Sequence, residues 1–144
     1  KRKAVETAKF YFFDIGVVRT LRRLPAILPE SSDFGEFFEH YIFMELKAWI
    51  DYRRPSSRLS YWRSLSGYEV DFVIDDEVAI EVKAATIAQD KHLLGLRALR
   101  EEGRIKRFFL VCRESRPRKV DGIDILPWRE FLGRLWAGDI VAGG

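Results

Sequence analysis

Three charged residues, Asp71, Glu81 and Lys83, lie inside two strand-like runs of Val, Ile and Phe in the stretch GYEVDFVIDDEVAIEVKAA, residues 67–85. Charges near the middle of such strands either face water or face one another. Two close carboxylates repel each other unless a proton or a cation lies between them. Their oxygens suit a hard ion such as Mg²⁺ or Mn²⁺, and a neighbouring lysine can orient a water or stabilise charge on a phosphate. These residue types therefore indicate metal-assisted hydrolysis of a phosphodiester.

Whether these side chains meet depends on how the two runs are connected. Residues 75–77, Asp-Asp-Glu, separate the runs and predict a tight hairpin. With a three-residue loop Ile74 faces Val78, and counting back pair by pair places Asp71 opposite Glu81. The three charges then share one face of the hairpin, and four apolar residues pack on the other face: Val70, Phe72, Ile80 and Val82. A two-residue loop would shift the register by one and put the two carboxylates on opposite faces. The alternative to a site is a solvated strand face with a surface ion pair.

The surrounding sequence predicts helices and strands that alternate along most of the chain. A long apolar stripe at helical spacing begins at Phe34, and a helical pattern also follows Lys83. We expect a short aromatic strand and short helix at 9–21, helices at 34–52, 87–103 and 127–140, and strands at 58–64, 68–74, 78–84, 107–113 and 123–128. This order predicts an α/β fold (an α+β sandwich), with helices packed against a mixed sheet.

Composition restricts the classes of protein that fit. The 144 residues can bury one core, and no run approaches the roughly 18 apolar residues of a membrane span, so we expect no membrane partner. Cys112 is the only cysteine, which fits a reducing cytoplasm. The net charge of +3 permits a nucleic-acid partner. His40 and His92 are too few and too far apart to suggest a zinc site, and an oligomer is compatible with the sequence.

The spacing of the three charges is that of a known superfamily. Asp71, nine intervening residues and then Glu81-Val82-Lys83 resemble the signature of the PD-(D/E)XK phosphodiesterases, which include many restriction enzymes and Holliday-junction resolvases. The expected elements match the αβββαβ core of that superfamily in order and length. The resemblance implies a restriction-endonuclease-like fold in which Asp71 and Glu81 hold Mg²⁺ (or Mn²⁺) and Lys83 assists the attacking water.

The same superfamily often adds a glutamate from the first core helix. Glu39 follows Gly35 by four residues, as in the resolvase-like pattern, so we assign Glu39 to the catalytic and metal-binding set. Glu45 is the rival, because helical phase places it among apolar residues, where an unpaired charge is costly.

A closer resemblance covers nearly the whole chain. The stretches FYFFDIGVVRTL, GEFFEHYIFMEL, YWRSLSGYEVDFVI and AIEVKAA look like the uncharacterised C-terminal domain of a large prokaryotic group of AAA-type P-loop ATPases. The resemblance implies that residues 1–33 lead in from an ATPase and winged-helix part and that residues 34–144 form the nuclease-like domain. We therefore expect a piece of a longer chain, with ATP bound only in the missing part and the ATPase domain as a partner.

Two functions from different classes follow from these resemblances. In the first, the domain is a Mg²⁺-dependent nuclease acting on nucleic acid, with DNA favoured over RNA. In the second, it keeps the fold but is catalytically inactive, and it binds nucleic acid or protein and assembles the ATPase. A purely structural appendage is a third interpretation. Glu81→Gln separates the first two, because it should abolish cleavage in one case and leave binding intact in the other.

Overall fold

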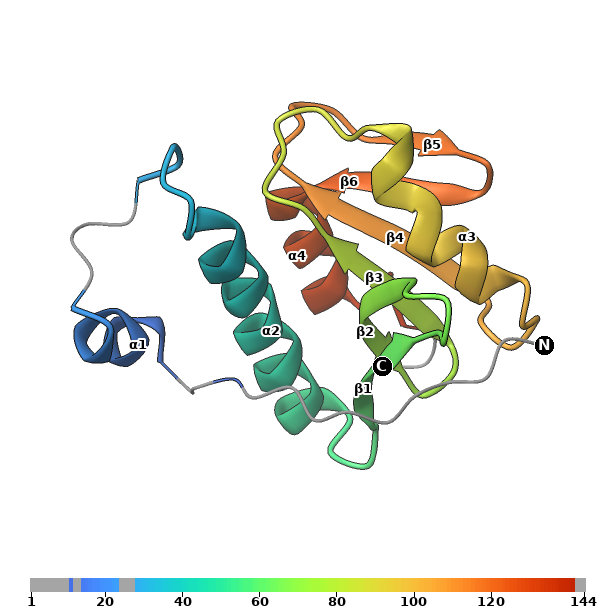
Figure 1. Ribbon diagram of the computed structural model, residues 1–144. Helices are drawn as coiled ribbons and strands as arrows, with labels where there is room; N and C mark the ends of the chain where they lie inside the picture. Colours follow the sequence, from blue (N-terminus) through green and yellow to red (C-terminus); the bar gives the residue numbers. More distant parts are fainter. Residues whose placement is uncertain (1–10, 12–13, 24–27, 142–144) are drawn as a thin grey trace.

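A computed structural model describes residues 11, 14–23 and 28–141 of the chain, apart from the side chains of residues 15 and 18. The elements within these ranges, in chain order, are α1 (Ile15–Leu21), α2 (Phe34–Arg53), β1 (Leu59–Arg63), β2 (Glu69–Ile74), β3 (Val78–Val82), the short 3₁₀ helix η1 (Asp90–Leu93), α3 (Leu94–Arg100), β4 (Arg107–Cys112), β5 (Arg118–Val120), β6 (Ile123–Pro127) and α4 (Trp128–Ala137). Figure 1 shows one sheet with α2 and α4 on one face and α3 on the other. The predicted α/β class is confirmed.

The six strands form a mixed sheet in the order β1-β2-β3-β4-β6-β5. The first three strands are an antiparallel meander, whereas β3, β4 and β6 run parallel and β5 pairs antiparallel with β6. Parallel neighbours need a crossover connection, and α3 supplies it between β3 and β4. The carboxyl ends of β3, β4 and β6 therefore lie at the same end of the sheet, and Lys83 follows β3 at this end.

Two apolar layers hold the helices against the sheet. The α2 and α4 layer is centred on residues with essentially no exposed surface, among them Ile42, Leu46 and Phe131. On the other face, α3 approaches β2 so closely that a Cβ at Gly95 would lie 1.9 Å from the carbonyl oxygen of Glu69. Only glycine permits this distance between a helix and a strand.

Both helices that the sequence predicts in the first half of the chain are observed. The helix predicted at 34–52 is observed as α2, and it ends at Arg53 because Arg54, the residue before Pro55, is disfavoured in helical geometry. The short helix expected near the start of the chain is α1. The aromatic strand expected at 9–13 lies outside the described residues except for Tyr11. Within the described ranges, no helix is both long and apolar enough to cross a membrane.

Two elements differ from the expectation. The strand β5 was not predicted, although Asp121-Gly122 is a typical hairpin dipeptide, and both residues adopt the positive φ (50° and 77°) that a two-residue turn of this kind requires. The helix expected over 87–103 is confined to η1 and α3, because the residues that precede Asp90 form a loop.

Candidate active site

The hairpin of β2 and β3 has the register that places the two carboxylates opposite each other. Ile74 pairs with Val78 and Phe72 with Ile80, so the loop contains the three residues 75–77. Continuing this register one step places Asp71 opposite Glu81. The predicted register is confirmed, and the two-residue loop is wrong.

Beyond Phe72 the carboxylates themselves join the two strands. The Asp71 N–H donates to Glu81 Oε2 at 3.3 Å, and the Val82 N–H donates to Asp71 Oδ2 at 2.9 Å. Asp71 is 5% exposed and Glu81 6%. Each carboxylate is therefore held by a main-chain donor of the opposite strand, and both are fixed in position below the surface.

The sheet is irregular at the residues on either side of Asp71. Strict alternation would place Val70 on the same face as Phe72, yet Val70 packs in the α3 layer and Phe72 in the α2 and α4 layer. The neighbouring strand β1 is irregular between Ser60 and Trp62, next to this point. The alternation of β2 therefore breaks between Val70 and Phe72, and the prediction that these two residues pack on the same face is wrong.

Lys83 completes the group that the sequence predicted on this hairpin. Its Nζ lies 2.6 Å from Glu81 Oε1, and its main-chain N–H donates to the carbonyl of Val111 in β4. The side chain of Lys83 is 37% exposed, whereas that of Glu81 is 9% exposed. The lysine therefore connects the buried carboxylates to solvent.

Burial and mutual repulsion change the protonation of these groups. Burial first, and the charge of Asp71 second, raise the pKa of Glu81 from 4.5 to about 7, although Lys83 acts in the opposite direction. Burial would lower the pKa of Lys83, but Glu81 and Asp71 outweigh it and raise that pKa overall. Lys83 is consequently an ammonium ion at neutral pH, and Glu81 exchanges its proton close to neutrality.

Glu39 approaches this group from α2, together with a residue that the sequence analysis did not assign to the site. Glu39 Oε1 accepts a hydrogen bond of 2.6 Å from the hydroxyl of Tyr11, whose ring stacks on Phe43 with centroids 4.1 Å apart. Glu39 contributes to the raised pKa of Lys83. The pKa of Tyr11 is raised by burial, by Glu39 and by Asp71, so its hydroxyl remains a donor. The aromatic run around Tyr11 was the only signal in the sequence.

The rival carboxylate belongs to another contact. Glu45 Oε2 accepts a hydrogen bond of 3.1 Å from Trp136 Nε1 in α4. Of the two histidines, His40 is buried beside Tyr11, and His92 caps η1 by accepting the Gln89 N–H at Nδ1.

The donor atoms fit a hard divalent ion held by two protein ligands. Among the described residues, no three side chains of His, Cys, Asp or Glu are grouped so as to hold a metal ion. Asp71 and Glu81 nevertheless offer two fixed carboxylates, and Mg²⁺ is commonly bound by one or two carboxylates with water and substrate phosphate as the other ligands. The role of Glu39 as a ligand stays a prediction, since its carboxylate is bound to Tyr11.

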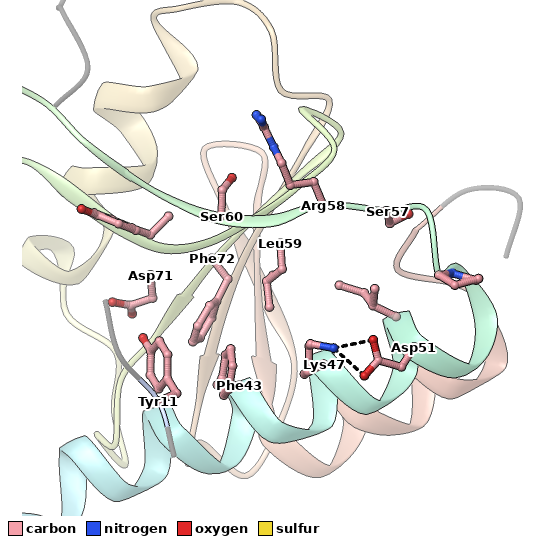
Figure 2. Close-up of a pocket in the computed structure, with 13 residues that line it drawn as sticks. Tyr11, Phe43, Lys47, Asp51, Ser57, Arg58, Leu59, Ser60, Asp71 and Phe72 are labelled. Carbon is pink, nitrogen blue, oxygen red and sulfur yellow. Dashed lines mark hydrogen bonds and ion pairs between the residues drawn. The ribbon is translucent and has the colours of Figure 1, made fainter. Parts of the chain in front are cut away.

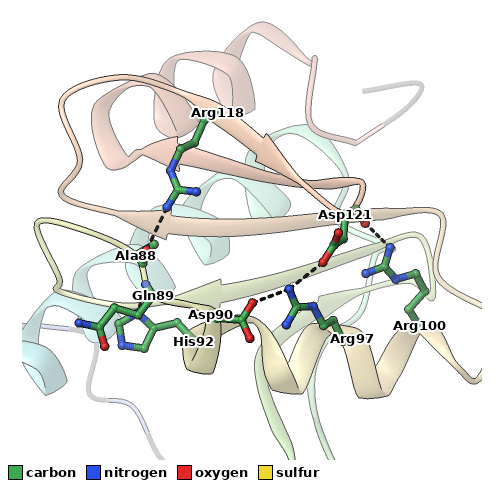
Figure 3. A network of polar contacts seen from close by, with 8 residues as sticks. All are labelled: Ala88, Gln89, Asp90, His92, Arg97, Arg100, Arg118 and Asp121. Carbon is green, nitrogen blue, oxygen red and sulfur yellow. Dashed lines mark hydrogen bonds and ion pairs between the residues drawn. The ribbon is translucent and has the colours of Figure 1, made fainter.

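A second polar network fixes the connection that follows Lys83 (Figure 3). Glu114 Oε1 accepts the Ala88 N–H at 2.7 Å, and Arg118 donates both to the Ala88 carbonyl and to Glu114. Arg97 of α3 binds Asp121 in the turn between β5 and β6 at 2.7 Å. Arg118 of the unpredicted strand β5 thus helps to hold the β3–η1 connection in place.

The acidic loop of the hairpin does not add charge to the site. Arg54 and Lys106 pair with Glu77, and Asp75 Oδ1 accepts the main-chain N–H of Arg58. The loop is also about 10 Å or more from Asp71, because at least three strand residues of about 3.4 Å each lie between them. Two of the three acidic side chains of the loop, those of Asp75 and Glu77, are therefore bound within the protein.

The fold and the site define a mixed α/β domain that carries a buried carboxylate pair and a partly exposed lysine on one hairpin. The chain belongs to the family described as "Domain of unknown function (DUF4143)", which matches residues 34–131. This range contains Glu39, Asp71, Glu81 and Lys83 but not Tyr11. No curated protein and no solved structure gives a significant match to the chain.

Proposed function

We propose that this domain is a metal-dependent, nuclease-like phosphodiesterase that forms the C-terminal part of an AAA-type ATPase and acts on nucleic acid, with DNA favoured. The meeting of Asp71 and Glu81 across the hairpin, with Lys83 Nζ 2.6 Å from Glu81, is the observation that carries the proposal. The motif and the order of the elements support it through their likeness to the PD-(D/E)XK phosphodiesterases.

The protonation states suggest how the residues share the work. A bound Mg²⁺ supplies Lewis-acid polarisation of a phosphoryl oxygen and a more acidic water. Asp71 and Glu81 would hold it. In the metal-free protein the carboxylates raise the pKa of Lys83 and keep it protonated, so we assign the lysine the role of donating hydrogen bonds and positive charge at the phosphate. Glu39, whose carboxylate is held by Tyr11, would complete the acidic group from the α2 side of the site.

A second candidate function has an observation in its favour. The described residues contain no three-ligand metal group, and Glu39 is bound to Tyr11. A domain that keeps the fold but only binds nucleic acid, or assembles the ATPase, is compatible with both facts. The two candidates differ in whether loss of a hairpin carboxylate abolishes an activity.

The test compares wild type with Asp71→Asn and Glu81→Gln. Mn²⁺ binding is measured by calorimetry, and cleavage is measured on single-stranded and duplex DNA and RNA. We expect both variants to weaken metal binding and cleavage by about 100-fold or more, since even residues behind the ligands cost about 10–100-fold. Glu45→Gln, which removes a carboxylate bound to Trp136, is the matched control and should behave as wild type.

Two other outcomes would contradict the nuclease proposal. Metal binding that Asp71→Asn retains would contradict the site. Nucleic-acid binding without cleavage, equal in wild type and both variants, would instead establish the binding and assembly module.

A further inference from the structure

A pocket of about 540 Å³ opens beside Asp71, between α2 and the edge strand β1 (Figure 2). This volume is within the range of about 300–1,000 Å³ typical of sites for small ligands. Asp71 of β2 lies at one end, and Phe43, Tyr61 and Phe72 supply aromatic surface. Asp71 therefore belongs to both the pocket and the carboxylate site. The other residues that line the pocket were not among the predicted site residues.

The floor of the pocket follows one face of α2. Phe43, Lys47 and Asp51 are spaced four residues apart and so lie one above the other along the helix. Eight residues of helix rise about 12 Å, which sets the length of the pocket. Figure 2 shows Asp71 at one end, Phe43 and Phe72 in the middle, and Lys47 with Asp51 at the other end.

The charges in this pocket favour a flat, uncharged group. Lys47 Nζ lies 2.5 Å from both carboxylate oxygens of Asp51, so the far end is a neutral ion pair. Figure 2 also shows the Arg58 side chain pointing away from α2. A phosphate would gain little there, whereas an aromatic ring would contact the aromatic walls, and its polar edge would meet both a donor and an acceptor.

We propose that this pocket receives the nucleobase of the nucleotide next to the phosphate bound at Asp71 and Glu81. The inference rests on the proposed function and names its substrate class. A base within a nucleic-acid duplex is stacked and paired. It must leave the duplex to enter the protein pocket between α2 and β1. The substrate is therefore a single strand, or a strand end or flap with unpaired nucleotides.

The first test separates the base from the phosphate and from the metal. The 144-residue chain, with EDTA present, is titrated by NMR with deoxyadenosine and, in parallel, with 2-deoxyribose, which lacks the base. Stacking on protein aromatics makes a base bind about 5- to 150-fold more tightly. We expect saturable shifts at pocket residues with deoxyadenosine alone. Equal binding of the two compounds, or no binding of either, would overturn the inference.

Variants locate the binding. Tyr61→Ala should weaken deoxyadenosine binding by about 5- to 150-fold, whereas Tyr52→Ala, at a tyrosine that is 77% exposed and outside the pocket, should not. If Tyr61→Ala does not fold, the double change Lys47→Ala with Asp51→Ala removes the far ion pair. Its matched control is Glu130→Ala with Arg134→Ala, another pair four residues apart on a helix. Unchanged binding in the pocket variants would contradict the proposal.

The failure of this inference differs from the failure of the proposed function. Equal cleavage of duplex and single-stranded DNA, unaffected by Tyr61→Ala, would remove the base pocket and leave the nuclease. Deoxyadenosine binding that depends on Tyr61, in a protein whose metal binding ignores Asp71→Asn, would leave the pocket and remove the nuclease.

Discussion

Glu81→Gln should make the metal-free protein more stable above neutral pH, and the size of the effect follows from the burial of the side chain. Glu81 is 6% exposed, and burial together with Asp71 raises its pKa from 4.5 to about 7. At about 1.4 kcal/mol per pH unit, the interval between these two values corresponds to about 3 kcal/mol of unfolding free energy. The shift therefore measures how strongly folding opposes the ionised carboxylate.

The sign is fixed by which state holds the proton. Below pH 4.5 the carboxyl of Glu81 is protonated in both states and contributes nothing. Between 4.5 and about 7 the unfolded chain releases the proton and the folded chain keeps it, so stability falls as pH rises. Above about 7 the whole cost is present. Glutamine cannot ionise, and the variant should lack this loss.

Urea denaturation from pH 4 to pH 8 with EDTA present measures the effect. The unfolding free energy of Glu81→Gln should gain about 3 kcal/mol on wild type across this interval, while the control Glu45→Gln should show no such gain. Adding Mg²⁺ at pH 8 should restore stability to wild type alone, by about 2.7 kcal/mol at one hundred times its Kd. Parallel pH curves for wild type and Glu81→Gln would refute the reasoning.

Two further changes test the scaffold around the site. Gly95→Ala would place a Cβ 1.9 Å from the Glu69 carbonyl oxygen, so we expect a loss of about 1–3 kcal/mol in chemical denaturation; Gly133→Ala, in a helix with nothing within 4 Å of the added Cβ, should instead stabilise by about 0.5–1 kcal/mol. Glu114→Ala leaves the buried Ala88 N–H without its acceptor, at a cost of about 1–3 kcal/mol. Hydrogen exchange at the Ala88 amide should accelerate, and protection equal to wild type would show that another group replaces Glu114.

The carboxylate pair was predictable because it is a local feature. The loop length and the alternation of side chains fix the register of a hairpin, and both can be read from residues 70–83. Glu39 and Glu45 were harder to separate, since helical phase alone leaves several faces open. In the folded chain Glu45 accepts a hydrogen bond from Trp136 of α4, a contact between segments 91 residues apart that no local pattern predicts.

The missing parts of the site arise from packing between distant segments. Tyr11 and Glu39 are 28 residues apart, and no local pattern predicts their hydrogen bond. The pocket likewise depends on how far α2 lies from β1. The strand β5 is different, because Asp121-Gly122 carried a usable turn signal in the sequence.

The short path between the two carboxylates has a kinetic consequence. Asp71 and Glu81 are only ten residues apart along the chain, and a hairpin closes in about 1–10 μs, long before distant elements dock. Their repulsion is therefore met early in folding, before the burial that is the largest cause of the raised pKa of Glu81. At the proposed metal site, a divalent cation bound by both carboxylates would offset this repulsion in the nascent hairpin, so we expect it to speed the folding of the chain in addition to slowing its unfolding.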